Sequence, residues 1–145
     1  MIKVFVAASW LQHGFGIVSV TCGRPQRQMR FGEMLISGCD SAGANLAVDL
    51  RHRVGAARVL NDLRRYGLTE LTLQADATDE EWGTTLTLGE RDVPVTPAQL
   101  SNFLACVASG GGGLFSAAVA RQLRTALEGV VQQDGNRTRR VRRCV

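Results

Sequence analysis

The spacing of apolar residues changes along this chain, and this change constrains the fold more than any other feature. Before residue 38 the apolar residues stand in short runs rich in β-branched and aromatic side chains, a composition typical of strands. The runs occupy residues 2–8, 15–22 and 29–37, and Gly23 and Pro25 supply turn chemistry between the last two. The sequence therefore predicts an antiparallel three-strand meander.

From residue 54 onward the spacing becomes helical. An apolar stripe with i, i+3, i+4, i+7 spacing predicts a helix over 54–66, and Gly67 stands where a glycine commonly ends a helix. The stripe consists of Ala56, Val59, Leu60 and Leu63. Residues 68–75 then alternate between apolar and polar side chains, which predicts a strand and a helix-to-strand unit typical of α/β folds. Residues 84–88 are a further strand candidate, and residues 43–52 fit a strand or a helix.

Two helices are predicted in the C-terminal part. Thr96 is a good N-cap, a proline follows it, and Gln99 stands three residues after the cap, so a helix is expected over 97–108. Four consecutive glycines at 110–113 end this helix, and a second helix is expected over 114–131. The two helices are expected to form a hairpin or to pack on one face of the sheet.

These elements define the predicted fold class, which is one α/β domain over residues 1–133. It has a mixed sheet that starts with the antiparallel three-strand meander, helices packed on the sheet and a C-terminal helical hairpin. The chain of 145 residues is long enough to bury a hydrophobic core. Residues 134–145, called here the arginine-rich tail, follow this domain.

Charge is distributed unevenly along the chain. The formal net charge is +4, and the arginine-rich tail alone holds five arginines against one aspartate, so residues 1–133 sum to zero. Residues 1–66 carry nine basic side chains against four acidic ones, and residues 67–133 carry three against eight. The body of the protein therefore has a half with a net charge of +5 and a half with a net charge of −5.

The arginines suggest contacts with a polyanion. A guanidinium presents a fork of donors that matches a phosphate or a carboxylate, so the expected partner is a nucleic acid, RNA or DNA, or an acidic protein surface. A solvated tail or an exposed turn can carry the same residues. The candidate nucleic-acid-binding residues are Arg137, Arg139, Arg140, Arg142, Arg143, Arg24, Arg27 and Arg30.

Cysteine spacing and hydropathy bear on the compartment. The four cysteines lie far apart without a CxxC pair, a spacing that suits neither a small disulfide scaffold nor a zinc site. Free thiols in a reducing cytoplasm are therefore expected. No apolar run approaches the roughly 18 residues needed to cross a membrane, so no membrane partner is expected.

The residues that could carry catalysis form no recognised motif. The two histidines lack any pattern that links them to a nucleophile or a second ligand, which favours a protein that is not an enzyme and has no cofactor. Asp76 and the acidic run Asp79, Glu80 and Glu81 could hold a divalent cation through their oxygens, although such a run is more often a solvated loop.

Four short segments carry a resemblance to a known family. "VFVAASW" (4–10), "GFGIVSV" (14–20), "LTLQADA" (71–77) and "GNRTRR" (135–140) resemble motifs of the ribonuclease H-like fold, and the similarity covers residues 2–77. The resemblance implies a nuclease that uses Mg²⁺ held by several carboxylates. In that alignment Asp76 matches the metal-binding acid of the fourth strand, and Asp49 could supply a helix acid. Ala7 and Arg140 stand at two other positions where that family has acids.

Three functional hypotheses follow from the sequence. The first is a non-catalytic nucleic-acid-binding protein that uses the arginine-rich tail for backbone contacts. The second is a protein–protein interaction module, a homo-oligomer in which the oppositely charged halves meet. The third is a divalent-metal-dependent nuclease of the ribonuclease H type that uses Asp76 and Asp49.

Overall fold

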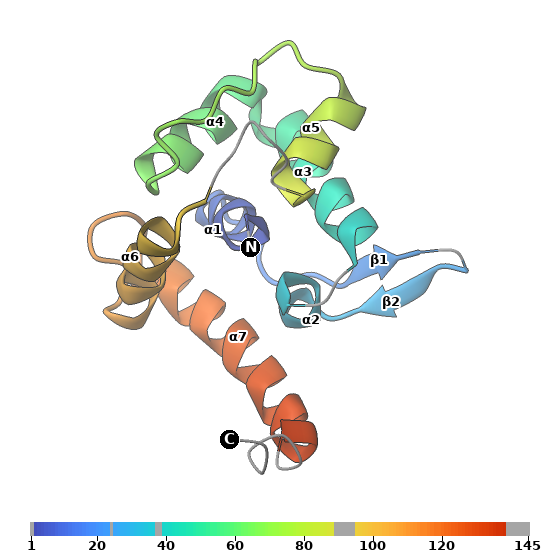
Figure 1. Cartoon of the computed structure of the whole chain (residues 1–145), viewed down its shortest axis with the longest axis vertical. Coiled ribbons are helices and arrows are strands. Elements are labelled where there is room, and N and C mark those ends of the chain that lie inside the picture. The colour runs from blue at the N-terminus through green and yellow to red at the C-terminus, as the bar shows by residue number, and fades with distance from the viewer. Residues whose placement is uncertain (1, 24, 37–38, 89–94, 139–145) are drawn as a thin grey trace.

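A computed structural model of the chain describes residues 2–23, 25–36, 39–88 and 95–138, with their side chains except at 88 and 129–138. Within these residues the chain forms seven helices and one two-stranded antiparallel sheet (Figure 1). The elements are α1 (Lys3–Gln12), β1 (Val20–Cys22), β2 (Arg27–Met29), α2 (Phe31–Ile36), α3 (Asp40–Val54), α4 (Ala56–Arg65), α5 (Asp79–Leu88), α6 (Pro97–Ala108) and α7 (Ala117–Thr138).

The predicted α/β fold with its mixed sheet and three-strand meander is wrong. Of residues 2–8, all but Ile2 lie in α1, and most of residues 29–37 lie in α2, so only Val20–Cys22 and Arg27–Met29 pair as strands in the described chain. The physical reason is burial. Every residue of α1 from Lys3 to Leu11 is buried, so its apolar side chains need no helical spacing. A continuous apolar run fits a buried helix as well as a buried strand.

The other two predicted strands are also absent from the described chain. Residues 68–75 run as an irregular segment that buries Leu68, Leu71 and Leu73 without pairing to a strand. Residues 84–88 belong to α5. A capping box starts this helix, because the Glu81 carboxylate accepts from the Thr78 backbone N–H at 2.9 Å and the Thr78 hydroxyl accepts from the Glu81 N–H at 3.2 Å. The segment 43–52, for which the sequence allowed a strand or a helix, is helical within α3.

The predicted helices over 54–66 and 97–108 correspond to α4 and α6. The capping box at the start of α6 is formed as the sequence indicates, with the Thr96 hydroxyl accepting from the Gln99 N–H at 3.2 Å. The last helix, α7, begins at Ala117 and continues to Thr138, so the arginine-rich tail begins inside this helix. α6 and α7 pack against each other.

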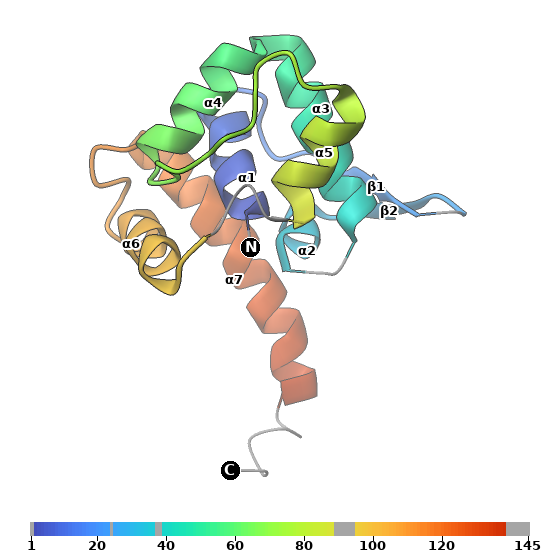
Figure 2. The same cartoon turned by 45° about the horizontal axis from the view of Figure 1, so that its top comes forward.

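The buried helix α1 organises the core. It contacts α2, α3, α4, α5 and α7, which surround it in both views (Figures 1 and 2). At one end of this core, Phe5 of α1 stacks against Phe103 of α6 with ring centroids 4.3 Å apart. Tyr66 and Phe115 complete this aromatic cluster, with centroids 5.9 and 5.6 Å from that of Phe103. These contacts bind the C-terminal helices to the N-terminal half of the chain.

Two polar contacts and one covalent bond fix helices around α1. The Asp62 carboxylate of α4 accepts a hydrogen bond from the buried Ser9 hydroxyl at 2.8 Å and lies 2.8 Å from His13 Nε2. A disulfide joins Cys22 of β1 to Cys39, next to the start of α3. The prediction that these cysteines are free is therefore wrong, because the fold brings two residues 17 apart in sequence to a Cα separation of 6.1 Å.

The other two cysteines take no part in this disulfide. Cys106 is a free thiol of intermediate exposure, and Cys144 lies outside the described residues. Among the described helices, none combines the length and hydropathy that a membrane span requires.

Candidate nucleic-acid interface

The predicted interface consists of two arginine groups that the structure describes to different extents. In the arginine-rich tail, the backbone of Arg137 lies in the last turn of α7, whereas Arg139, Arg140, Arg142 and Arg143 lie outside the described residues, as does Arg24 of the hairpin. Arg27 lies in β2 and is exposed. Arg30 lies between β2 and α2. Helix α7 therefore leads the chain from the body into the arginine-rich tail (Figures 1 and 2).

Arg30 and Arg27 differ in whether an acid of the same chain pairs with their guanidinium group. The guanidinium of Arg30 donates to the Glu33 carboxylate from Nε at 3.0 Å and from Nη2 at 2.7 Å. This hydrogen bonding, together with the Arg30 backbone N–H, holds the pKa of Glu33 below its usual value. Arg27 forms no ion pair with the acids of the described chain. Of these two arginines, Arg27 is therefore the one without an ion pair in the described chain, and its charge acts on Glu33 only at longer range.

The arginines of α3 make contacts within the protein. The side chain of Arg51 is 17% exposed; its Nη1 lies 3.6 Å from the Asp79 carboxylate, and its guanidinium lies over the Trp82 ring at 5.0 Å. Arg53 donates to the Asp49 carboxylate at 3.2 Å. Its guanidinium also lies over Trp10 at 5.3 Å and over Phe15 at 5.2 Å. These cation–π and ionic contacts use the arginines of α3 for packing.

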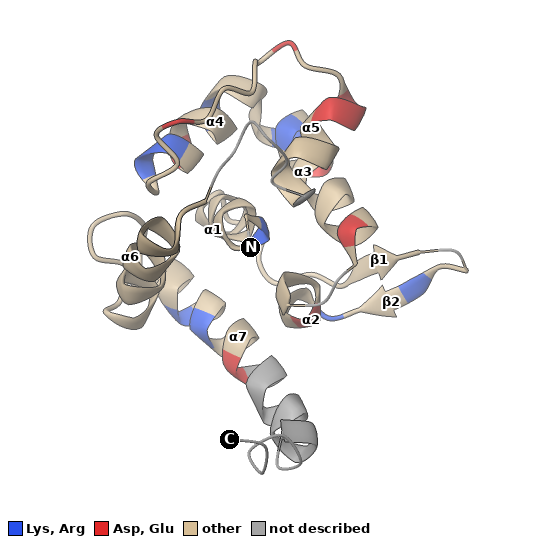
Figure 3. Cartoon of the chain, viewed as in Figure 1, with Lys and Arg blue, Asp and Glu red and all other residues tan. Residues whose placement is uncertain are grey.

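Sequence reasoning missed two further cations, which belong to α7. Arg121 and Arg124 are exposed, and neither pairs with an acid in the part of the chain that the structure describes. Figure 3 shows basic positions in blue along α7. They are three residues apart, so they project from neighbouring positions of the same helix face. The signal that could have identified them is their position on the polar side of the predicted helix 114–131. They lie on the helix that leads into the arginine-rich tail.

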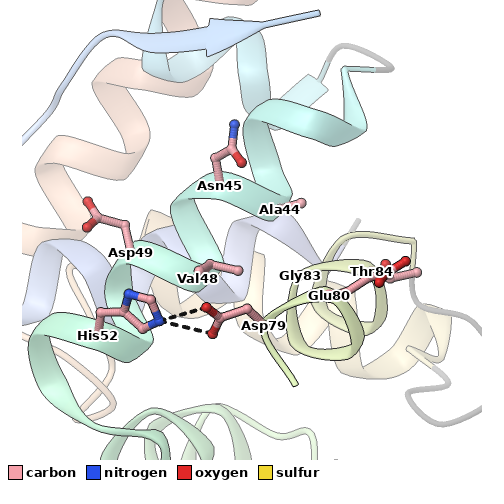
Figure 4. Close-up of a pocket in the computed structure, with 9 residues that line it drawn as sticks. All are labelled: Ala44, Asn45, Val48, Asp49, His52, Asp79, Glu80, Gly83 and Thr84. Carbon is pink, nitrogen blue, oxygen red and sulfur yellow. Dashed lines mark hydrogen bonds and ion pairs between the residues drawn. The ribbon is translucent and has the colours of Figure 1, made fainter. Parts of the chain in front are cut away.

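The acidic half of the chain packs against the basic half. Asp79, Glu80 and Glu81 occupy the first turn of α5, where negative charge interacts favourably with the helix dipole. Asp79 lies 3.0 Å from His52 Nε2 of α3, and Figure 4 shows these two side chains pointing toward one another. Part of the charge complementarity between the two halves is therefore satisfied within one copy of the chain.

A groove of about 470 Å³ runs between α3 and α5 beside this pair (Figure 4). The small apolar lining residues Ala44, Val48 and Gly83 are called here its floor, and a Cβ on Gly83 would lie only 3.2 Å from the Ala44 Cβ and 3.3 Å from the Val48 Cγ2. Glycine at this position therefore allows α3 and α5 to approach closely. The lining residues are Ala44, Asn45, Val48, Asp49, His52, Asp79, Glu80, Gly83 and Thr84.

The residues proposed for metal binding and catalysis occupy different elements. Asp49 lies on α3 and pairs with Arg53, and Asp76 is exposed in the segment before α5. Among the described residues, no three His, Cys, Asp or Glu side chains are placed to hold a metal ion together. Ala7 is fully buried in α1. The segments 4–10 and 71–77, which the ribonuclease H-like resemblance treats as strands, are helical and irregular respectively.

The sequence was also compared with known proteins. It matches no protein-family model, and no curated protein matches it. The functional argument for this chain therefore depends on its own residues.

Proposed function

We propose that this chain is a non-catalytic nucleic-acid-binding protein whose arginine-rich tail contacts the phosphate backbone. The observation that carries the proposal is a contrast between two sets of arginines. Five arginines stand within residues 137–143 without an acid among them. In the body, by contrast, Arg30, Arg51, Arg53 and Arg65 each have a carboxylate within 4.0 Å. The other body arginines with described side chains have no such ion pair among the described residues, and they are spread over several elements: Arg27, Arg58, Arg64, Arg121 and Arg124. The tail thus concentrates cationic charge that Asp134, its one acid, offsets only in part.

The chemistry of arginine suits a phosphate partner. A guanidinium remains charged at every physiological pH and donates two parallel hydrogen bonds to phosphate oxygens. Such contacts displace condensed counterions, so they give an affinity that depends on salt and little on sequence. Contacts to phosphate carry no sequence information of their own, so a preference among sequences is not part of the proposal.

Two parts of the body carry further arginines that are proposed to contact phosphate together with the tail. Arg121 and Arg124 lie on the exposed side of α7, within the helix that leads into the tail. Arg27 lies on the hairpin, and α2, which follows that hairpin, packs against α7. These three arginines are expected to add weaker phosphate contacts to those of the tail.

The proposal is tested by fluorescence anisotropy with short duplex DNA and single-stranded RNA at low salt. We compare the full chain, a deletion of residues 136–145, and a full-length variant in which the five tail arginines are replaced by glutamine. Both variants are expected to bind about tenfold or more weakly, because each lost phosphate contact removes counterion release. Equal binding by all three proteins, or no binding by the full chain, would reject the proposal.

Two single variants compare an arginine that has no ion pair in the described chain with an arginine that is paired with an acid. Arg27→Gln removes an exposed guanidinium that no acid pairs with in the described chain, whereas Arg30→Gln removes one held by Glu33. We expect Arg27→Gln to weaken binding more than Arg30→Gln. The opposite order would show that Arg30 leaves Glu33 to contact the ligand.

A further inference from the structure

The groove between α3 and α5 has a lining suited to a cationic segment. Three carboxylates line it, those of Asp49, Asp79 and Glu80, and no lysine or arginine does. Asp49 is paired with Arg53, and Asp79 with His52 and Arg51, but their side chains remain 48% and 53% exposed. A carboxylate has about four lone-pair sites, so it can accept from a second guanidinium while keeping its first partner.

The size and floor of the groove fit an extended peptide better than a rigid body. Its volume of about 470 Å³ accommodates a few residues, and its small apolar floor of Ala44, Val48 and Gly83 can pack against the methylene stem of an arginine. The polar side chains of Asn45 and Thr84, also in the lining, can hydrogen-bond to the backbone of such a peptide.

We propose that this groove binds the arginine-rich tail of a second copy of the chain, so that the protein associates head to tail. Charge complementarity identifies the occupant, because the tail carries a net charge of +4 and the groove is lined by three acids. The position of α7 indicates which copy of the chain supplies the bound tail. In both views the C-terminal end of α7 lies far from α5, so we propose a second copy, rather than the same copy, as the source of the bound tail (Figures 1 and 2).

This arrangement has two consequences. A tail that binds the groove of the next copy joins two different surface patches, so the contacts either close, with a reciprocal dimer as the smallest closed form, or continue as an open chain. The same tail cannot occupy the groove and a phosphate backbone at once. Self-association and nucleic-acid binding are therefore expected to compete, although either can exist without the other.

The inference is tested by sedimentation velocity of the full chain over a wide concentration range, at low and high salt. We expect assembly that grows with concentration, dissolves in high salt and disappears on deletion of residues 136–145. In the groove variant Asp49→Asn/Glu80→Gln, self-association is expected to weaken roughly tenfold, because two exposed charge pairs are lost. A non-reducing gel separates this assembly from crosslinking through Cys106 or Cys144.

The control variant is Glu70→Gln/Asp76→Asn, which removes the same charge from two exposed acids that do not line the groove. It should assemble like the unmodified chain. A strict monomer at low salt, or groove and control variants that assemble equally, would overturn the inference. Anisotropy of the groove variant with duplex DNA separates the two proposals, since loss of self-association with nucleic-acid binding retained supports both of them. If the unmodified chain assembles but does not bind nucleic acid, only the proposed function fails.

Discussion

The Asp79 carboxylate lies 3.0 Å from His52 Nε2, and this contact joins the acidic start of α5 to the basic end of α3. The same two helices are joined by Trp82 and by the close approach at Gly83. The oppositely charged halves of the sequence thus meet inside a single copy. Residues 1–133 have no net charge, so the net charge of +4 is that of the arginine-rich tail. Both proposals therefore concern the tail.

The α3–α5 contact is expected to depend on Trp82. Its side chain is fully buried, and its indole N–H donates to the Ala47 carbonyl at 2.9 Å. Trp82→Phe should lower the free energy of unfolding by about 1–2 kcal/mol through the lost hydrogen bond and a small cavity, and Trp82→Ala by about 3–5 kcal/mol. Urea denaturation followed by circular dichroism measures both values. If Trp82→Phe were as stable as the unmodified chain, the hydrogen bond from Trp82 to the Ala47 carbonyl would not contribute to stability.

The capping box of α6 is expected to contribute to stability. Thr96→Ala removes the oxygen that accepts from the Gln99 N–H, and it should lower the free energy of unfolding by about 1 kcal/mol. Ser101→Ala serves as the control, because Ser101 is an exposed hydroxyl within the same helix and alanine has the higher helix propensity. The control should be neutral or slightly stabilising in the same denaturation experiment. Equal losses in the two variants would speak against a capping role.

The buried phenol of Tyr66 should make stability depend on alkaline pH. Burial raises the pKa of Tyr66 from 10.0 to about 12, and the nearby Asp62 carboxylate acts in the same direction. Between these values the unfolded chain loses the phenol proton while the folded chain keeps it, so stability falls as pH rises from about 10 toward 12. Below pH 10 this group contributes no pH dependence.

Tyr66→Phe tests this expectation, because it removes the titrating group and a buried hydroxyl that meets no hydrogen-bond criterion in the described chain, although the nearby Arg65 guanidinium acts to lower its pKa. The variant should be as stable as the unmodified chain at neutral pH and lose less stability on the alkaline side. Tyr66 is the only tyrosine in the sequence, so tyrosinate absorbance reports its ionisation directly. A phenol that ionises near pH 10 in the folded protein would contradict its burial.

The disulfide between Cys22 and Cys39 should stabilise the fold. It closes a loop with a sequence separation of 17, for which the entropy of the unfolded chain predicts about 3 kcal/mol. The double variant Cys22→Ser/Cys39→Ser should lose about that amount in urea denaturation under oxidising conditions. Reductant should destabilise the unmodified chain by a similar amount and leave the double variant unchanged. An effect of reductant on both proteins would implicate a different thiol.

Sequence patterns identified helices where one face is polar. α4 and α6 have exposed charged or polar residues opposite their buried ones, so periodicity and the Thr96 capping box locate them. The same reasoning failed for α1, whose buried residues occupy all sides of the helix and therefore show no period. It also failed for α5, although Thr78 and Glu81 have the spacing of a capping box.

The candidate interface was predictable only in part. The density of arginine in the tail and hairpin is visible in the sequence, but which arginines are paired depends on contacts between distant segments. Arg51 meets Asp79, 28 residues later in the sequence, and Arg53 meets Trp10. The groove likewise requires α3 and α5 to be side by side, which neither segment indicates alone.

The salt dependence of nucleic-acid binding tests the central claim most directly. Each phosphate neutralised on duplex DNA contributes about −0.9 to the slope of log K against log salt, so five tail arginines contribute about −4.5. The account predicts that the full chain has a steep slope and that deleting residues 136–145 makes it shallower by about four to five. The same slope for both proteins, or affinity that does not change with salt, would contradict the account.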